Sequence, residues 1–550
     1  MPEAYDAIVI GGGHNGLVAA AYLARGGLRT VVLERRPVLG GAAVTEEVVP
    51  GFRFSELSYV VSLLRPEIIR DLDLPRHGLA ILPLDGTFTP LRPGEGPPGG
   101  DYLWRTNDHG RTLRELRRWS LADAEAYDEY GLLMVAMASF VKPILSLVPP
   151  DPTGLDPRDL LALAGLARRF RSLPELHQAV FVQLMTMSAA DFLDQWFETD
   201  PLKATMAASG IIGTFLGVRS PGTAYVLLHH YMGEIDGAFR AWGIPRGGTG
   251  GVSAAIAGAA RSLGAEIRTE APVARIEVRD GRAVGVVLES GEIVRGRVVL
   301  SALDARRTLL DLLEPGHLPA DVERAVRRIR YRGSSGKVNL ALDRLPSFSC
   351  LPGPGEHLRG AISISPSVDW MERAYDDAKY GHWSRRPYLD VVIPTLVDPS
   401  LAPPGKHVMS CFVQYAPYAL DPALGTWDDQ REAFGDAVLD TLAEFAPDIR
   451  DIVVGRQVLT PLDIERMTGL SEGNIFQGEL TLEQLFFNRP IPGWAKYRTP
   501  IRDLWLCGSA THPGGGIMGA NGRLAALEVL RSRAGGRGRG GRPAGMGSAA

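Results

Sequence analysis

The first forty residues alternate short apolar runs with a glycine-rich turn and a helix-like stretch. Residues 7–10 (AIVI) and 30–33 (TVVL) have the unbroken apolar character of buried parallel strands. Between them, residues 17–25 carry the small and apolar side chains of a packed helix. The pattern predicts a strand, a helix and a second strand over residues 7–33.

Three glycines, Gly11, Gly13 and Gly16, join the first strand to the helix with the spacing G-x-G-x-x-G. Gly11 allows a tight turn, Gly13 lets the backbone approach a pyrophosphate, and Gly16 lets the helix pack on the strand. The helix N-terminus offers free N–H groups and a positive dipole end to phosphates. This order of elements predicts a dinucleotide-binding turn.

An acidic residue, Glu34, ends the second strand, where it can accept hydrogen bonds from an adenosine ribose. A carboxylate there argues against a 2′-phosphate, and so against NADP. Gly40 and Gly41 form a second glycine turn, which lets the chain pass close to the diphosphate and ribityl chain of a flavin. The sequence therefore favours FAD over NAD.

Helical spacing, with apolar residues at i, i+3 and i+4, dominates the region from about 111 to 240. Residues 111–141, 156–170 and 188–197 are predicted helices, and Ser120 and Ser188 are predicted N-caps. Strand-like runs follow at 273–279, 283–289, 292–302, 337–343, 361–367 and 407–413.

The C-terminal part contains a last strand near 503–509, a glycine turn and a final helix over 522–532. Gly514, Gly516 and Gly519 formally repeat G-x-G-x-x-G, but no acid follows on a second strand, so we do not interpret them as a second dinucleotide site. We expect their backbone to pass beside a flavin ring, with the helix N-terminus stabilising negative charge on it. No dedicated NAD(P) domain is predicted.

These elements predict an α/β fold with a discontinuous Rossmann-type FAD-binding domain and a mixed α+β substrate domain that carries a helical insertion. The FAD-binding domain is expected to collect residues 1–75, 240–310 and 455–532, and the substrate domain residues 76–239 and 311–454. Residues 533–550 are low-complexity and basic, and are predicted to be a disordered, solvated tail.

Composition is that of an ordinary soluble globular protein, with 45% hydrophobic and 22% charged residues in 550. A net charge of −4 gives no indication of a nucleic-acid partner. The start, MPEAYDA, lacks a basic signal region, and no 18 successive residues are all apolar. We expect a cytoplasmic protein, with residues 131–148 as a candidate for peripheral membrane contact or, alternatively, a core helix.

The cysteines are Cys350, Cys411 and Cys507, far apart and without a C-x-x-C pair. This spacing predicts free thiols and argues against a flavoprotein disulfide reductase, which needs a redox-active dithiol beside the flavin. No metal site is predicted.

Both glycine motifs, GGGHNGLVAAAYLARGGLRTVVLERRPVLGG and CGSATHPGGGIMGANGR, resemble the FAD motifs of the amine-oxidase-like flavoproteins. The resemblance is to the phytoene desaturase branch, and within it to the subgroup of pyridine nucleotide-disulfide oxidoreductase domain-containing protein 2. It covers nearly the whole chain. It implies bound FAD and a substrate domain with a tunnel for a long apolar molecule.

The resemblance also implies cofactor contacts by position. Gly11, Gly13, Gly16, Glu34, Gly40 and Gly41 would hold the ADP half, and Val273 would contact the adenine. Along the ribityl chain and ring would lie Gly508, Ser509, Gly519 and Ala520. Many relatives have an acid where this chain has Ser509, which puts the detail of FAD binding there in doubt.

The expected reaction is oxidation of CH–CH or related groups of an isoprenoid-like substrate, with hydride transfer to flavin N5. The alternatives are an amine-oxidase-type reaction on a small polar substrate, which predicts an aromatic cage, and a flavin-stabilised interaction protein with little turnover. His512 is a weak catalytic candidate that could equally bond a backbone carbonyl. His229 and His230 are pocket or core residues. The substrate, the electron acceptor and the oligomeric state stay open.

Overall fold

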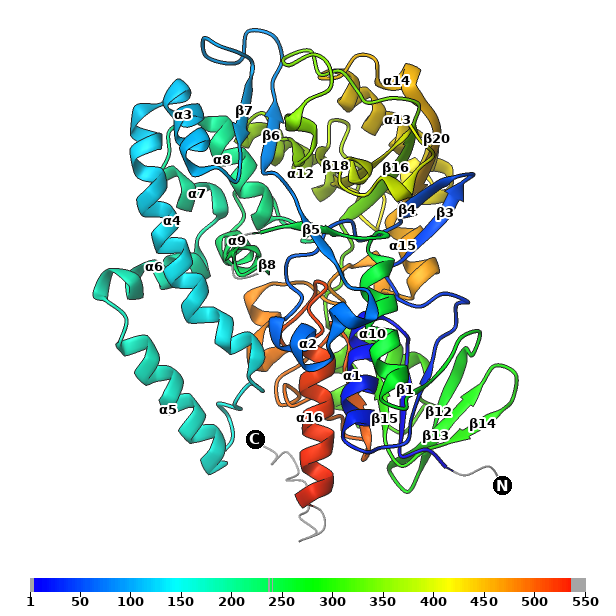
Figure 1. Ribbon diagram of the computed structural model, residues 1–550. Helices are drawn as coiled ribbons and strands as arrows, with labels where there is room; N and C mark the ends of the chain where they lie inside the picture. The colour runs from blue at the N-terminus through cyan, green and yellow to red at the C-terminus, as the bar shows by residue number, and fades with distance from the viewer. Residues whose placement is uncertain (1–3, 236–237, 240, 536–550) are drawn as a thin grey trace.

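A five-stranded parallel sheet forms the lower half of the computed structural model, which describes residues 4–235, 238–239 and 241–535 (Figure 1). The strands, in spatial order, are β11 (Glu266–Arg268), β2 (Thr30–Leu33), β1 (Ala7–Ile10), β15 (Val299–Ser301) and β21 (Leu504–Leu506). Neighbouring strands all run parallel. The strands predicted at 7–10 and 30–33 are confirmed to the residue.

Both faces of this sheet are covered, which explains the unbroken apolar runs. Val9 and Val32 face α1 (His14–Arg25), α10 (Gly250–Ser262) and α16 (Ala520–Gly535). Ile8 and Val31 face an antiparallel sheet and a short helix on the other side. Those elements are β12 (Val273–Arg279), β13 (Arg282–Leu288), β14 (Ile293–Arg295) and α11 (Ala320–Arg327). The predicted Rossmann-type α/β fold is confirmed.

A second, seven-stranded sheet lies above the first. Its order is β20 (Val453–Leu459), β16 (Ser335–Leu342), β19 (His407–Gln414), β18 (Tyr388–Val392), β17 (Ala361–Ile364), β6 (Thr87–Pro90) and β7 (Tyr102–Arg105). One face packs with α12 (Val368–Lys379), α13 (Trp427–Ala443) and α14 (Ile449–Ile452). The boundary predicted at 455 falls inside β20, which pairs with β16 and so belongs to this sheet.

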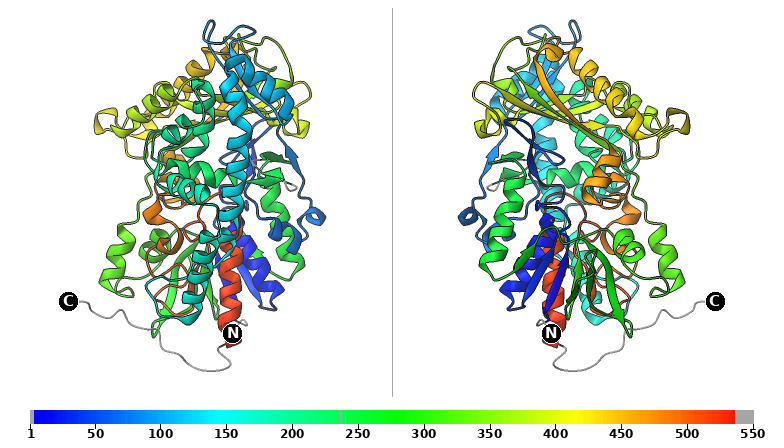
Figure 2. Two further views of the ribbon diagram at one scale, coloured as in Figure 1. Left: turned by 90° about the vertical axis from the view of Figure 1, so that its left-hand side faces the viewer. Right: turned by 90° about the vertical axis from the view of Figure 1, so that its right-hand side faces the viewer.

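Helices α3 to α9 form a third layer with a core of its own. They are α3 (His109–Trp119), α4 (Leu121–Val141), α5 (Pro157–Arg171), α6 (Glu175–Thr186), α7 (Ala189–Asp194), α8 (Asp200–Ala207) and α9 (Thr223–Tyr231). The predicted caps are confirmed: Ser120 Oγ accepts from the Asp123 N–H at 3.1 Å and Ser188 Oγ from the Asp191 N–H at 3.0 Å. Figure 2 shows α4 running along this side of the molecule.

Short elements connect the layers. They are β3 (Thr45–Val49) with β4 (Phe52–Ser55), β5 (Ile81–Pro83) with β10 (Gly243–Pro245), β8 (Glu234–Ile235) with β9 (Ala238–Phe239), α2 (Pro66–Asp71) and α15 (Pro461–Thr468). Of the predicted tail, residues 533–535 are instead the end of α16, and residues 536–550 lie outside the described residues.

The helical segment Leu121–Ser146 is long and apolar enough to cross a membrane by length and composition, with a mean hydropathy of 1.2 over its most apolar 18 residues. Tyr130, Met134 and Met137 on α4 are nevertheless fully buried in the helical core. A core helix of a folded domain meets the same test, but only 39% of this window is buried and Leu132 is 74% exposed, so both interpretations of the segment stay open.

Candidate functional site

The two predicted glycine turns lie against each other at the carboxyl end of β1. The Gly40 N–H donates to the Gly12 carbonyl at 2.9 Å, and Gly13 and Gly40 form a parallel bridge. A cavity between them, the FAD groove, opens at this sheet edge, where α/β folds bind their ligands. Its lining includes Gly11, Gly13, His14, Asn15, Gly16, Glu34, Arg36, Gly40, Gly41, Ala42, Ala302, Leu303, Ile475, Gln477 and Ser509.

Gly13 and Gly16 have different structural roles. A Cβ on Gly16 would lie 2.1 Å from the Gly11 carbonyl oxygen, so this glycine is required for α1 to pack on β1. A Cβ on Gly13 would meet nothing nearer than 3.9 Å. The space beside Gly13 is therefore an open cradle next to the N-terminus of α1, as a pyrophosphate requires.

Glu34 is oriented by the backbone around it. Its Oε2 accepts from the Gly12 N–H at 2.7 Å and its Oε1 from the Arg36 N–H at 2.9 Å, while the side chain stays buried. Each carboxylate oxygen keeps a second lone pair for a ribose hydroxyl. Val273 lines an adjoining cavity with Gly11 and Glu34, at the end of the groove where adenine contact is expected.

The C-terminal loop closes the groove from the opposite side. Asn15 Nδ2 donates to Ser509 Oγ at 3.1 Å, and His14 Nε2 lies 3.1 Å from the Gly516 carbonyl oxygen. Asn15 Oδ1 is buried without a hydrogen-bond partner among the described residues. A buried amide oxygen of this kind needs a donor, and a cofactor hydroxyl can supply one.

Three other predicted C-terminal residues serve the scaffold. A Cβ on Gly508 would lie 2.2 Å from the Ala302 carbonyl oxygen, so Gly508 allows close strand packing. Gly519, at φ 73°, precedes α16, and Ala520 begins it. None of the three lines the cavities described in this section; Gly516 and Ile517 do. The open cradle, the ribose-side acid and the orphaned amide oxygen together fit FAD.

A second cavity, the flavin chamber, adjoins the groove and shares His14, Ala42, Ile475 and Ser509 with it. Its remaining wall is largely apolar. That wall includes Leu57, Val60, Val61, Leu63, Ile212, Trp242, Phe412, Ile464, Phe476 and Ile517. A flavin ring held by the groove would therefore face an apolar space.

Three basic side chains line the flavin chamber. Burial lowers the pKa values of His14 and His230 to about 4, so both imidazoles are neutral near pH 7. Burial also lowers the pKa of Lys337 to about 7, an effect that Cys411 and Asp390 oppose. The Lys337 Nζ donates to Ser410 Oγ at 2.5 Å and lies 4.5 Å from the ring centroid of Tyr59.

The predicted histidines differ in whether they line a cavity. His512 is buried with its Nε2 3.0 Å from the Ile144 carbonyl oxygen and lines none of these cavities, so the structure favours the backbone-contact alternative. His230 lines the flavin chamber, whereas His229 is a core residue. Sequence reasoning missed His14 and Lys337, although a lysine at the start of the apolar strand 337–343 was an available signal.

The three cysteines are free. Burial raises the pKa of Cys350 to about 11 and that of Cys411 to about 12, and burial also raises the pKa of Cys507. Thiols in this state are poor nucleophiles, which agrees with the predicted lack of dithiol chemistry. Among the described residues, no group of three or more metal-ligating side chains occurs.

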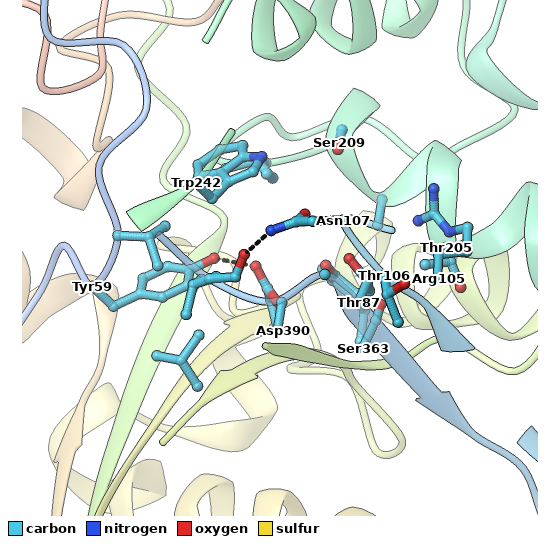
Figure 3. Close-up of a pocket in the computed structure, with 18 of the residues that line it drawn as sticks. Tyr59, Thr87, Arg105, Thr106, Asn107, Thr205, Ser209, Trp242, Ser363 and Asp390 are labelled. Atoms are coloured by element: carbon cyan, nitrogen blue, oxygen red, sulfur yellow. Dashed lines mark hydrogen bonds between the residues drawn. The ribbon is translucent and has the colours of Figure 1, made fainter. Parts of the chain in front are cut away.

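A third cavity, the distal chamber, continues from the flavin chamber past Tyr59, Val60, Ile212 and Trp242, which line both. Its walls are polar, with Thr87, Arg105, Thr106, Asn107, Thr205, Ser209, Ser363, Tyr388 and Asp390 (Figure 3). Tyr59 marks the passage and donates to Asp390 Oδ2 at 2.5 Å.

Comparison with known proteins agrees with this site. Residues 9–67 match the NAD(P)-binding Rossmann-like domain, and residues 185–530 match the flavin containing amine oxidoreductase family. Pyridine nucleotide-disulfide oxidoreductase domain-containing protein 2 of Rattus norvegicus is 43% identical over 546 residues, covering 96% of this chain and 94% of that protein.

Two further relatives are more distant. The lycopene-forming phytoene desaturase of Paracoccus sp. is 26% identical, and the alignment covers 96% of this chain and 98% of the desaturase. A triple mutant of putrescine oxidase has the same fold, with a TM-score of 0.58, 16% identity, and coverage of 96% of this chain and 99% of that one. The chain thus belongs to the flavin containing amine oxidoreductase family, and it is an FAD-dependent oxidoreductase.

Proposed function

We propose that this enzyme oxidises CH–CH or related groups of a long, largely apolar, isoprenoid-like substrate. The observation that supports this most is the apolar flavin chamber directly beside the FAD groove. The distal chamber extends it, as an elongated substrate requires. A phytoene desaturase among the full-length relatives supports the same substrate class.

Bound flavin supplies an acceptor for a hydride at N5. The apolar wall excludes water and orients the substrate chain by contact. Neutral His14 and His230 place no fixed charge beside the reacting carbon. Lys337, with a pKa of about 7, can hold or release a proton near neutral pH.

An amine-oxidase-type reaction on a small polar substrate is less well supported. It predicts an open aromatic cage, and the flavin chamber does contain the aromatic rings of Tyr59, Trp242, Phe412 and Phe476. The rings of Tyr59 and Phe412 stack on each other, with centroids 5.7 Å apart, so this pair does not form the two facing walls of a cage.

We also propose that the enzyme works in the cytoplasm and touches a membrane peripherally to collect its substrate. Large apolar side chains on the helical layer are exposed, among them Leu155, Leu161 and Leu176. Free thiols suit a reducing compartment.

The test is anaerobic mixing of the FAD-loaded protein with a lipid extract. We expect the flavin absorbance to bleach and mass spectrometry to find a lipid that has lost two hydrogens. The control is the same protein stripped of FAD, which should leave the lipids unchanged. Bleaching by small amines and by no lipid would overturn the proposal, and no bleaching by either would favour a binding protein with little turnover.

A further inference from the structure

A row of polar side chains crosses three strands of the seven-stranded sheet next to Lys337. Asn339 on β16 pairs with Ser410 on β19 and with Gln457 on β20. Lys337 lies two residues before Asn339 on β16, so both side chains point to the same face of the sheet. Lys337, Asn339 and Ser410 are at most 2% exposed. The register thus brings a buried polar row to the lysine of the flavin chamber.

Four hydrogen bonds join these side chains, and all four donate in the same direction. Lys337 Nζ donates to Ser410 Oγ at 2.5 Å, and the Ser410 hydroxyl donates to Asn339 Oδ1 at 3.2 Å. Asn339 Nδ2 then donates to Gln457 Oε1 at 3.0 Å, and Gln457 Nε2 donates to Glu56 Oε1 at 2.7 Å. Hydrogen bonds aligned in this way strengthen one another. We call this series, from Lys337 to Glu56, the polar chain.

The direction of the polar chain is fixed from its far end. Glu56 Oε1 accepts whether the carboxyl group is ionised or carries a proton on Oε2. Gln457 must therefore turn its amino group toward Glu56 and its carbonyl toward Asn339. Asn339 is held the same way round by a second bond, because its Nδ2 also donates to the Glu56 backbone carbonyl at 3.1 Å. Asn339 Oδ1 can only accept, so it takes the single hydroxyl hydrogen of Ser410.

Ser410 consequently offers Lys337 only a lone pair. A neutral lysine amine has two N–H donors and one lone pair of its own. A hydroxyl free to rotate could donate to that lone pair and occupy it, but the Ser410 hydrogen is already bonded to Asn339. The lone pair of neutral Lys337 is therefore left for the flavin chamber, which Lys337 lines.

The charged and titratable groups around Lys337 let it change protonation state near neutral pH. Burial lowers the pKa of Lys337 to about 7, which Cys411 and Asp390 oppose. Burial raises the pKa of Cys411 to about 12 and that of Asp390 to about 6, so at pH 7 the thiol is neutral and most of the carboxyl is ionised. The Tyr59 ring faces Lys337, and burial raises the pKa of Tyr59 well above its usual range. Near pH 7, Lys337 is therefore present in both neutral and protonated forms.

The remaining titratable groups do not reverse the polar chain. Burial raises the pKa of Glu56 to about 7, and its Oε2 lies 3.7 Å from Arg36 Nη2, which pairs with Glu46 at 2.7 Å. His14 and His230, the other basic groups of the flavin chamber, are neutral near pH 7. Because Glu56 Oε1 accepts in either state, the direction of the chain is the same on both sides of pH 7.

We propose that the polar chain holds Ser410 as an acceptor and so keeps the lone pair of Lys337 available as a base in the flavin chamber. Asn339, Gln457 and Glu56 are then positioning residues. This rests on the proposed function, in which one substrate carbon gives a hydride to bound FAD. The neighbouring C–H bond breaks, its electron pair forms the C=C bond, and its proton passes to Lys337 Nζ, which becomes an ammonium group.

Carbamylation by cyanate tests the availability of the lone pair without any substrate. Isocyanic acid forms an N–C bond with a neutral amine, and the amine proton moves to the nitrogen of the reagent. The FAD-loaded protein is labelled at a series of pH values, and mass spectrometry compares Lys337 with the exposed Lys379. We expect labelling of Lys337 to rise with a midpoint near pH 7. A Lys337 that stays unlabelled at about pH 9, where its amine is neutral, would overturn the proposal.

The variant Ser410→Ala gives the decisive comparison at about pH 9. If Ser410 offers only a lone pair, removing its hydroxyl should leave the labelling rate of Lys337 unchanged. If Ser410 instead donates to Lys337 in the wild type, Ser410→Ala should label about fivefold faster or more, the worth of one hydrogen bond, and the proposal is wrong.

The variant Asn339→Leu should have the opposite effect, because it releases the Ser410 hydroxyl to donate to Lys337. We expect labelling at about pH 9 to slow by about fivefold or more, and Asn339→Leu/Ser410→Ala to regain the wild-type rate. A purely structural role would not give this rescue, and slow labelling of the folded double variant contradicts the proposal. Asn339→Asp should label like the wild type, because a protonated carboxyl group presents the same acceptor and donor as the amide.

The control for these variants is Gln430→Leu, which removes a half-buried amide that donates to the Leu424 carbonyl at 2.8 Å, outside the polar chain. It should label like the wild type. FAD content and circular dichroism report folding. If Asn339→Leu does not fold, the comparison of wild type with Ser410→Ala still decides.

Flavin bleaching separates this inference from the proposed function. If lipids bleach the flavin but Ser410→Ala speeds the labelling of Lys337, the function stands and the role of the polar chain is wrong. If labelling follows the expected pattern but no apolar compound bleaches the flavin, the role of the polar chain stands and the function is wrong.

Discussion

Burial, more than charge pairing, sets the pKa values of the basic residues that line the flavin chamber. His14, His230 and Lys337 all have lowered pKa values, and desolvation is the main cause for each. The chamber therefore carries little fixed charge at neutral pH despite three basic side chains. Such an environment suits an apolar substrate and leaves Lys337 as a group that changes charge near pH 7.

The lowered pKa of Lys337 predicts a pH-dependent stability. The folded pKa is about 7 against an ordinary value of 10.5, so between these values only the unfolded chain holds the proton. Stability should rise with pH across this window, by about 1.4 kcal/mol for each pH unit. Lys337→Met should remove that rise, so its stability relative to wild type is greatest at pH 7 and below.

Urea denaturation of the FAD-loaded wild type and of Lys337→Met measures the effect. It is repeated in steps of roughly one pH unit from about pH 6 upwards. Lys379→Met is the control, because Lys379 is exposed and pairs with Asp376. Parallel stability curves for wild type and Lys337→Met would show that Lys337 is not a buried neutral lysine.

At the scale of elements, the sequence predicted those strands, turns and helix caps that depend only on residues close together in the chain. Strands β1 and β2 and the glycine turns were predictable because their apolar runs and spacing are local. The caps at Ser120 and Ser188 were predictable for the same reason. The alignment of Lys337, Phe412 and Asp390 on three neighbouring strands was not predictable, because these residues are far apart in sequence and only the sheet register brings them together. The domain boundary predicted at residue 455 differs from the structure, because the sheet to which a strand belongs depends on the strand it pairs with, and the sequence does not show that partner.

The glycine turn allows a matched pair of variants on one loop. Gly16→Ala places a methyl group 2.1 Å from the Gly11 carbonyl oxygen, so it should destabilise the fold by about 1–3 kcal/mol or more. Gly13→Ala meets nothing nearer than 3.9 Å, and Gly13 already has φ −68°, which alanine readily adopts. We expect Gly13→Ala to fold normally without FAD but to bind FAD at least about tenfold more weakly.

Thermal melts of the FAD-free proteins and titration of each with FAD separate the two effects. An FAD-free Gly13→Ala that melts far below wild type would mean that the cradle is filled by protein. Unchanged FAD affinity in that variant would place the pyrophosphate elsewhere.

At the scale of the whole molecule, helix α5 stands at the edge of the structure (Figure 1). Its sequence contains both leucines and arginines. Leu161 on α5 is 74% exposed and Leu155 just before it is 88% exposed. Arg168, Arg169 and Arg171 occupy the last turn of the helix. Apolar side chains beside basic ones are typical of surfaces that bind anionic membranes.

We therefore expect the protein to cosediment with vesicles that contain phosphatidylserine and to bind purely zwitterionic vesicles less well. The double variant Leu155→Ser/Leu161→Ser should weaken binding by about tenfold or more, because each leucine contributes on the order of 1.5 kcal/mol when buried. Val454→Ser, at an exposed site on β20, should leave binding unchanged. Equal binding of the double variant and wild type would rule out this face as the contact.

The hydrogen bond between Asn15 and Ser509 joins residues 494 positions apart. The groove consequently lacks its C-terminal wall until nearly the whole chain has left the ribosome. A nascent chain that carries only the first glycine turn lacks the loop that completes the site, so we expect tight FAD binding only once residue 509 has been synthesised. We expect a chain truncated before Ser509 to bind FAD more weakly than the full chain, because Asn15 then lacks its partner across the groove.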